Sequence, residues 1–579
     1  MKKYGIKTEI KEMLEPEEIL LDTGERKKRE KGKLELPIQN KVFVIIFAIF
    51  FLFFVSIISR TVYLVFAKGE EFKESAINNY LKTEFVEAPR GLIISKDSKT
   101  LAENKETGED LSEEKARIYS RNYIDSEYFS FILGYTREAA KEEIDADKDY
   151  YRLGDWIGKD GVEKQYEKYI RGDKGKREII VNSKGKILSD EVVKEPKIGN
   201  TLVLNIDAEL QKKIQDTIKQ EVPGRDAAAI AINPQNGAVL AMVSVPSDDN
   251  NVWSQKQISQ EELQKLQKEK KIYNINRVIK GKYPVGSIIK PLVGVAALQE
   301  KVITAGRNIV CKGSVIIPNP WAPQSPTEKK DNKTHGVTNL EKAIAESCNV
   351  YFFIVGGGYE NIKGLGITGL KKYFDLFHLE ELLGIDLPGE RTGFVPTKEW
   401  FDKEMKSKVK RNWSIADIYD VSIGQGFFSG TPLNMAYALS AIANGGKIFQ
   451  PQVADKIIDS EGNVIENIEP KVLREGFISK ENIAQVKSAM RACVTSGSCV
   501  RLNQLPVSSG GKTGTAESGR RNYPHAWFVS FAPYENPEIL LLVLVEYGGE
   551  GARVASPIAK DVLEWYFTKD QPEASDSEE

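Results

Sequence analysis

The sequence contains few residues of the kinds that bind metals or cross-link small extracellular domains. Its 579 residues include four cysteines, Cys311, Cys348, Cys493 and Cys499, and three histidines. No two cysteines have CxxC spacing and the histidines lie far apart, so we expect no metal site. A charge excess is also lacking, because 81 lysines and arginines nearly balance 83 aspartates and glutamates. This balance gives no support to nucleic acid as a partner.

Charged residues are absent from one long run, residues 42–59 (VFVIIFAIFFLFFVSIIS). A helix of this length rises roughly 27 Å, enough to cross the hydrocarbon core of a membrane. No small-residue cleavage site follows, so residues 42–66 are expected to stay as a transmembrane anchor. Basic residues gather at positions 26–33, which predicts a cytoplasmic tail, residues 1–41, with all later residues on the other side.

The rest of the chain is long enough for two domains, and its character changes near residue 205. Residues 67–205 mix short β-like runs with turns rich in glycine and charge, which predicts an irregular module. Residues 206–568 form the second predicted domain, and residues 569–579 a disordered acidic tail. In the second domain we predict a helix capped by Asp207, strands at 227–233, 238–245, 526–531 and 539–545, with Asn236-Gly237 as a hairpin turn, and a helix at 559–567.

The first candidate for chemistry is a serine followed three residues later by a lysine, Ser287 and Lys290. Pro291 leads into a helical run, and proline fits the first turn of a helix, so both side chains share one face of a helix start. A serine hydroxyl is a poor nucleophile, but a lysine whose pKa is lowered by burial can take its proton. Alone, the pair equally fits a capped helix with a solvated lysine.

The second candidate is Ser347 with Asn349. These residues follow a helix that a capping box, residues 338–341 (TNLE), is expected to open from Thr338. A hydroxyl two residues before a carboxamide can relay a proton while the amide binds a peptide backbone. Alone, such a pair is most often a helix-end cap.

The third candidate is Lys512-Thr513-Gly514 with Thr515, just before a predicted strand. Glycine allows a substrate backbone to approach, lysine supplies positive charge, and threonine hydroxyls can bind a terminal carboxylate. A phosphate-binding loop is the rival interpretation. It fails because Pro506 stands where that loop needs its first glycine.

Together and in this order, the Ser-x-x-Lys, Ser-x-Asn and Lys-Thr-Gly motifs resemble the signature of penicillin-binding proteins and serine β-lactamases. Residues 384–390 (GIDLPGE) and 424–426 (GQG) resemble further segments of class B transpeptidases. Residues 90–93 (RGLI) and 158–163 (GKDGVE) resemble motifs of their pedestal, or dimerisation, domain. Residues 393–400 (GFVPTKEW) look more like the elongation type, penicillin-binding protein 2.

This resemblance implies an α/β (α+β) transpeptidase domain of the β-lactamase-like class, in which helices flank an antiparallel five-stranded sheet. An elongated pedestal and one N-terminal transmembrane helix complete the expected fold. The implied activity is that of a peptidoglycan D,D-transpeptidase in the bacterial cytoplasmic membrane, with its catalytic domain outside and no cofactor. Stem peptides and the lipid-linked precursor polymer are the implied substrates, β-lactams the covalent inhibitors, and a polytopic membrane glycosyltransferase the implied partner.

The resemblance also implies a role for each motif residue. Ser287 is expected to attack the penultimate D-alanine carbonyl, with Lys290 as base, and Ser347 to pass a proton to the departing D-alanine. Backbone N–H groups of Ser287 and Thr515 are expected to form the oxyanion hole. The predicted substrate-binding residues are Asn349, Lys512, Thr513, Gly514 and Thr515.

Several alternatives stay open at this stage. A division-type transpeptidase, a membrane-bound β-lactamase, a β-lactam sensor and a catalytically silent scaffold all share parts of the pattern. For the cysteines, only Cys493 and Cys499 are close in sequence, and in an oxidising compartment they can pair. We expect buried free thiols as the default.

Overall fold

The computed structural model describes residues 40–106, 119–182, 186–255, 258–268, 275–318, 324, 326–519 and 523–569. The predicted cytoplasmic tail up to residue 39 and the predicted acidic tail from residue 570 lie outside these residues. The chain divides into two compact units, Met1–Lys82 and Thr83–Glu579. The first contains helices α1 (Asn40–Phe66) and α2 (Gly69–Tyr80).

Helix α1 contains the whole predicted anchor and has no buried residue. Polar side chains gather near its C-terminal end, where Arg60 is followed by Thr61, whose hydroxyl donates to the Ile57 carbonyl at 2.8 Å. Among the described residues, α1 is the one helix long and apolar enough to cross a membrane. A long, mostly apolar helix that is exposed along its whole length in the described part of the chain fits a single-pass membrane anchor.

A five-stranded sheet lies at the centre of the second unit, with strand order β11-β10-β22-β21-β20 and antiparallel pairing throughout. The predicted fold class is therefore confirmed. Gly237 in the predicted hairpin turn has a φ of 81°, a value that glycine adopts easily. The strands are β10 (Ala227–Ile232), β11 (Val239–Val245), β20 (Gly510–Ala516), β21 (His525–Ala532) and β22 (Ile539–Val545).

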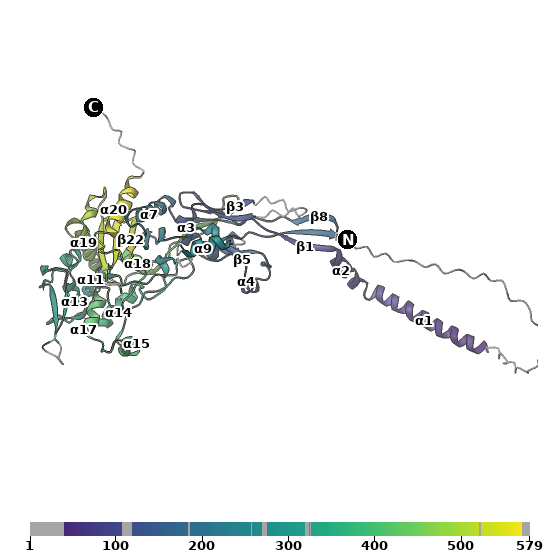
Figure 1. Cartoon of the computed structure of the whole chain (residues 1–579), viewed down its shortest axis with the longest axis horizontal. Coiled ribbons are helices and arrows are strands. Elements are labelled where there is room, and N and C mark those ends of the chain that lie inside the picture. The colour runs from purple at the N-terminus through teal and green to yellow at the C-terminus, as the bar shows by residue number, and fades with distance from the viewer. Residues whose placement is uncertain are drawn as a thin grey trace, which may run out of the picture. The chain divides into compact units, whose positions relative to one another are not determined.

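Helices cover both faces of this sheet, as Figure 1 shows. Along β22, Leu540 and Leu542 pack into a cluster with α11 (Lys290–Gln299) and α18 (Pro432–Ala443). Their neighbour Leu541 packs with α7 (Ala208–Glu221) and α20 (Ala555–Thr568) on the other face. Because successive side chains of a strand alternate between faces, a strand buried on both sides is continuously apolar.

Two predicted helix caps have different outcomes. The Asp207 carboxylate accepts a hydrogen bond from the Leu210 N–H at 2.9 Å at the start of α7, which confirms that cap. Helix α12 (Leu340–Ala345) is capped by Asn339, so the prediction of Thr338 as cap is wrong. Thr338 is the last residue of strand β15 (Gly336–Thr338), which shifts the helix start by one residue.

A second sheet, of six strands in the order β18-β17-β9-β2-β3-β4, takes strands from both predicted domains. The predicted boundary near residue 205 therefore stays a prediction. These strands are β2 (Ile93–Ile94), β3 (Thr100–Glu106), β4 (Tyr119–Tyr123), β9 (Thr201–Leu204), β17 (Ala454–Ile458) and β18 (Val464–Asn467). Between β4 and β9 lie α3 (Ser126–Leu133), β5 (Thr136–Glu138), α4 (Lys141–Ala146), β6 (Trp156–Gly158), α5 (Gly161–Gln165), α6 (Glu167–Ile170), β7 (Gly175–Val181) and β8 (Ile187–Lys194).

The two pedestal segments noted in the sequence meet in a buried ion cluster. The Arg90 guanidinium donates to Glu163 at 2.6 Å and to Glu167 at 2.7 Å. Arg121 donates to the other oxygen of Glu163 at 2.6 Å, and Glu163 is fully buried. A buried carboxylate is stable only with such partners, so this cluster joins α5 and α6 to the chain just before β2.

Candidate active site

Five predicted site residues line one cleft of about 1070 Å³: Ser287, Ser347, Asn349, Thr513 and Thr515. They come from three segments, namely the start of α11, the junction of α12 with α13 (Asn349–Gly357), and strand β20. The three other predicted site residues, Lys290, Lys512 and Gly514, are buried beside this lining. The tertiary structure thus brings together residues more than two hundred positions apart.

Ser287 lies in a single 3₁₀ turn, η2 (Gly286–Ile289), that runs directly into α11. Pro291 stands in the first turn of that helix, as predicted. Lys290 is fully buried, and its ammonium donates to the Ser347 carbonyl and the Asn349 side-chain oxygen, each at 2.7 Å. Burial lowers the pKa of Lys290 to about 8, against the opposing charges of Asp331 and Cys348.

Ser347 has a left-handed backbone, with a φ of 62°. For a residue with a Cβ this conformation costs on the order of 1–2 kcal/mol, so the surrounding contacts must hold it. The following residue, Cys348, donates its N–H to the Ala343 carbonyl at 2.9 Å. This turn directs the Ser347 hydroxyl toward Lys290, whose Nζ lies 3.3 Å away.

The third segment, β20, is an edge strand of the central sheet. A Cβ built on Gly514 would lie 2.9 Å from the Ile288 side chain, so glycine lets this strand pack against the 3₁₀ turn. Lys512 is fully buried and donates to the Thr513 carbonyl at 3.0 Å. Burial and the charge of Lys290 hold the pKa of Lys512 well below its usual value.

The backbone of Thr515 faces away from its neighbouring strand. Its carbonyl accepts a hydrogen bond from the Gln425 amide at 3.3 Å, and the Gln425 oxygen accepts from the Glu517 N–H at 3.2 Å. The N–H and C=O of a strand residue point to the same side, so the Thr515 N–H also lies on the free edge. Gln425 belongs to residues 424–426 (GQG), and the sequence alone gives it no role.

The structure adds cleft residues that the sequence analysis did not identify. The Lys329 ammonium donates to both carboxylate oxygens of Asp420, at 2.7 and 2.8 Å, and both side chains line the cleft. Lys329 lies in β14 (Thr327–Lys330) and Asp420 in α17 (Ile415–Ser422). No local pattern marks an ion pair between elements so distant in sequence. Ser498 also lines the cleft.

The cysteines correct one expectation. Cys493 and Cys499 form a disulfide, with their Cα atoms 5.0 Å apart, so the prediction of free thiols is wrong for this pair. The turn after α19 (Lys480–Ser496) brings them together. Cys311 and Cys348 are buried free thiols, as expected.

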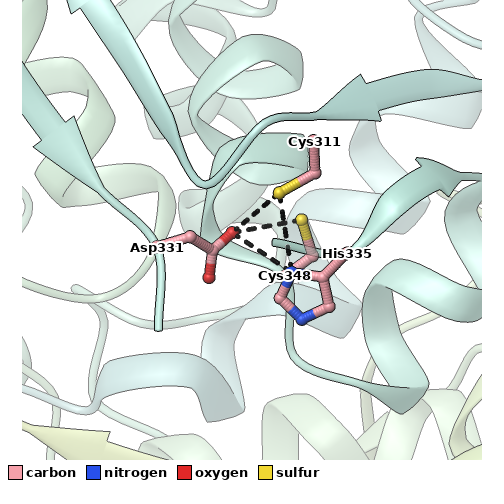
Figure 2. A group of neighbouring side chains, drawn as sticks. All are labelled: Cys311, Asp331, His335 and Cys348. Atoms are coloured by element: carbon pink, nitrogen blue, oxygen red, sulfur yellow. Dashed lines mark hydrogen bonds and ion pairs between the residues drawn. The ribbon is translucent and has the colours of Figure 1, made fainter. Parts of the chain in front are cut away.

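Four side chains converge beside the second motif, as Figure 2 shows: Cys311, Asp331, His335 and Cys348. Their donor atoms all lie within 4.8 Å of one another. The prediction of no metal site depended on the spacing of cysteines and histidines along the sequence. The fold brings four possible ligands together from separate segments, so that spacing no longer argues against a metal. The four residues come from the end of β12 (Ile309–Cys311), from the segment before β15 and from the cap of α13.

The geometry of this cluster fits a tetrahedral zinc ion. Asp331 Oδ2 lies 3.2 Å from Cys348 Sγ, 3.5 Å from Cys311 Sγ and 3.6 Å from His335 Nδ1. Zinc bonds of about 2.0–2.3 Å separate tetrahedral ligands by roughly 3.3–3.8 Å. The other ring nitrogen of His335 lies 3.4 Å from the Glu346 carbonyl, which leaves Nδ1 to face the cluster.

Comparison with known proteins agrees with the geometry. The family model for the penicillin binding protein transpeptidase domain matches residues 227–564, and that for the penicillin-binding protein dimerisation domain matches residues 114–204. Peptidoglycan D,D-transpeptidase MrdA of Haemophilus influenzae is 30% identical over 482 residues, which are 79% of this chain and 70% of the relative. MrdA of Acinetobacter baumannii is 31% identical over 468 residues, 78% of this chain and 66% of the relative.

Solved structures give the same result. PBP2 of Pseudomonas aeruginosa, in complex with WCK 5153, superposes with a TM-score of 0.70 at 28% identity, covering 86% of this chain and 100% of that one. PBP2 of Helicobacter pylori, in complex with MreC, has a TM-score of 0.68 at 25% identity, covering 84% and 99%. The chain therefore belongs to the penicillin-binding protein transpeptidases, as a class B member of the elongation type, and is a peptidoglycan D,D-transpeptidase.

Proposed function

We propose that this cleft cross-links peptidoglycan stem peptides through an acyl-enzyme on Ser287. The observation that carries the proposal is the convergence of all three motifs on one cleft, with the buried Lys290 amine 3.3 Å from the Ser347 hydroxyl. Burial favours the neutral amine of Lys290, which is the form that can accept a proton.

In the first half-reaction, the Ser287 hydroxyl oxygen bonds to the penultimate D-alanine carbonyl carbon while Lys290 takes its proton. The backbone N–H groups of Ser287 and Thr515 stabilise the oxyanion. The amide C–N bond then breaks, and the departing D-alanine receives a proton from Ser347, which Lys290 replaces across their 3.3 Å contact. In the second half, the amine nitrogen of a neighbouring stem bonds to the ester carbonyl carbon, the C–O bond to Ser287 breaks, and Lys290 passes the proton that the amine loses to the Ser287 oxygen.

Substrate orientation falls to the residues around the nucleophile. The Asn349 amide oxygen is already bonded to Lys290, so its NH₂ group is free to donate to the donor peptide backbone. Thr513 and Thr515 bind the terminal carboxylate, and the buried Lys512 side chain lies next to Thr513 in β20. Gly514 keeps β20 close to Ser287.

The setting of the reaction is the outer face of a bacterial cytoplasmic membrane. Helix α1 fits a membrane anchor, and the positive charges before it support a cytoplasmic tail. The substrates are stem peptides of a lipid-linked precursor polymer, and the membrane partner is a polytopic glycosyltransferase. A relative with the same fold, PBP2 of Helicobacter pylori, is recorded in complex with MreC.

The direct test is covalent labelling. The extracytoplasmic part, or the full chain in detergent, is incubated with a fluorescent penicillin beside Ser287→Ala, and label is read on a denaturing gel with intact mass. Stable label on the wild type and none on Ser287→Ala supports the proposal. Loss of free penicillin without stable label would instead identify a β-lactamase, and label without cross-linking of stem peptides a β-lactam sensor.

We also propose that Cys311, Asp331, His335 and Cys348 hold a zinc ion. Four protein ligands leave no open position, so the ion would be structural. It would hold the Ser347 turn, because Cys348 lies inside the second motif and the Val350 N–H donates to Asp331 at 2.8 Å. Two thiolates, an imidazole and a carboxylate are ligands that favour zinc over magnesium or calcium.

Elemental analysis tests this site. Protein purified without added metal should contain about one zinc per chain, and Cys311→Ala should lose most of it. Chelation should also lower the melting temperature, since a ligand at about a thousand times its dissociation constant stabilises the folded state by about 4 kcal/mol. Wild-type protein that stays zinc-free after incubation with zinc would refute the site.

A further inference from the structure

The turn after α19 connects the second and third motifs of the active site. Ser498, in this turn, donates its N–H to the Ala345 carbonyl at 2.9 Å. Ala345 is the last residue of α12, two positions before Ser347. On the other side, the hydroxyl of Ser498 lies 2.7 Å from that of Thr513 in β20.

The Cys493–Cys499 disulfide closes this turn. Inside the loop, the N–H groups of Gly497 and Cys499 both donate to the Cys493 carbonyl, at 3.1 and 2.9 Å. A Cβ built on Gly497 would lie 2.3 Å from the Ala345 carbonyl oxygen, so the turn packs directly on the end of α12. Covalent bond, hydrogen bonds and close packing together fix the position of the Ser498 side chain.

The direction of the hydrogen bond between the Ser498 and Thr513 hydroxyls determines how Thr513 can bind a carboxylate. A carboxylate only accepts hydrogen bonds, so Thr513 can bind one only by donating its hydroxyl proton. The Thr513 oxygen can accept a hydrogen bond at the same time, and Ser498 is placed to donate it. The alternative acceptor for Ser498 is the Cys493 sulfur at 3.3 Å, a weaker acceptor than a hydroxyl oxygen.

From this geometry we propose that Ser498 is a positioning residue for the transpeptidase reaction and that the Cys493–Cys499 disulfide holds it in place. Ser498 donates to Thr513 and turns the Thr513 proton toward the carboxylate of the donor peptide or of a β-lactam. The hydrogen bond from Ser498 to Thr513 polarises the Thr513 hydroxyl, and this strengthens the hydrogen bond that Thr513 donates to the carboxylate. The inference rests on the proposed role of Thr513 in the cleft.

The test compares penicillin acylation of wild type, Ser498→Ala, Ser498→Thr and Ser496→Ala. Ser496 is exposed two residues earlier and bonds only within its own helix end, so it is the matched control. The binding constant and the acylation rate constant are measured separately, for a penicillin and for its methyl ester. Thermal unfolding confirms that each variant is folded.

Ser498→Ala should lower the second-order acylation constant for the free carboxylate about two- to tenfold, mostly through weaker binding. The methyl ester should show no such loss, and Ser498→Thr should recover most of it. Equal losses for acid and ester, or no loss for either, would overturn the role of Ser498. Failure of wild-type acylation would instead refute the proposed function, so the two failures are distinguishable.

The role of the disulfide is tested by a thiol reductant. Reduction transfers two electrons and two protons from the reductant to the disulfide and leaves two thiols. Reduced wild type should then show the same acid-selective loss as Ser498→Ala, while the Cys493→Ala/Cys499→Ala variant should show this loss without reductant and no further change with it. Unchanged acylation after complete reduction, verified by mass, would overturn the role of the disulfide.

Discussion

The pH dependence of acylation tests the role of Lys290 most directly. Burial lowers the pKa of this lysine to about 8, and only the neutral amine can take the Ser287 proton. The neutral fraction is about one-tenth at pH 7 and about nine-tenths at pH 9, so the acylation rate constant should rise about tenfold over this interval. Because Lys290 must be deprotonated to act as the base, the acylation rate constant should fall as the pH drops below about 8.

Three neighbouring groups face this amine. Asp331 and Cys348 oppose the lowering of the Lys290 pKa, and the charge of Lys290 in turn lowers the pKa of buried Lys512.

The assay is stopped-flow acylation at saturating penicillin, from about pH 6.5 to about pH 9. Lys290→Arg should lose acylation at every pH, because a guanidinium stays protonated throughout. Lys282→Arg, an exposed site eight residues earlier, should keep the wild-type profile. A rate constant that is flat or falls across this interval would refute Lys290 as the base.

Three further changes test the surrounding structure. Arg90→Met should destabilise the fold by about 3–5 kcal/mol in urea unfolding, since it leaves two buried glutamates short of a partner, whereas exposed Arg137→Met should have little effect. Ser347→Ala should slow transpeptidation by about 10²- to 10⁴-fold. Gly514→Ala should impair acylation because its Cβ meets the 3₁₀ turn, whereas Gly519→Ala, with open space around it, should not.

Local sequence was sufficient for the parts of this protein that depend on neighbours along the chain. The anchor helix follows from an unbroken apolar run, and the Asn236-Gly237 turn from the backbone preferences of two residues. Pro291 predicted that Lys290 lies at the start of a helix, because proline is tolerated in the first turn of a helix and breaks later turns. The three motifs identified the family, since their order and chemistry are readable without a structure.

The exact start of α12 was not readable in this way. Thr338 and Asn339 are both good caps, and only the strand that ends at Thr338 decides between them. When two adjacent residues can both cap a helix, strand pairing in the folded protein therefore decides which of them does so.

Other features depended on contacts between distant segments. The four residues of the candidate zinc site span 37 positions of sequence between Cys311 and Cys348, and no spacing rule covers them. Ser498 became part of the active site only because its turn meets both α12 and β20. The sequence by itself determined the anchor, the motifs and the family, because these follow from short-range covalent and steric constraints. The tertiary structure alone decided the disulfide, the zinc cluster and the neighbours of Thr513, because these depend on how separate elements pack.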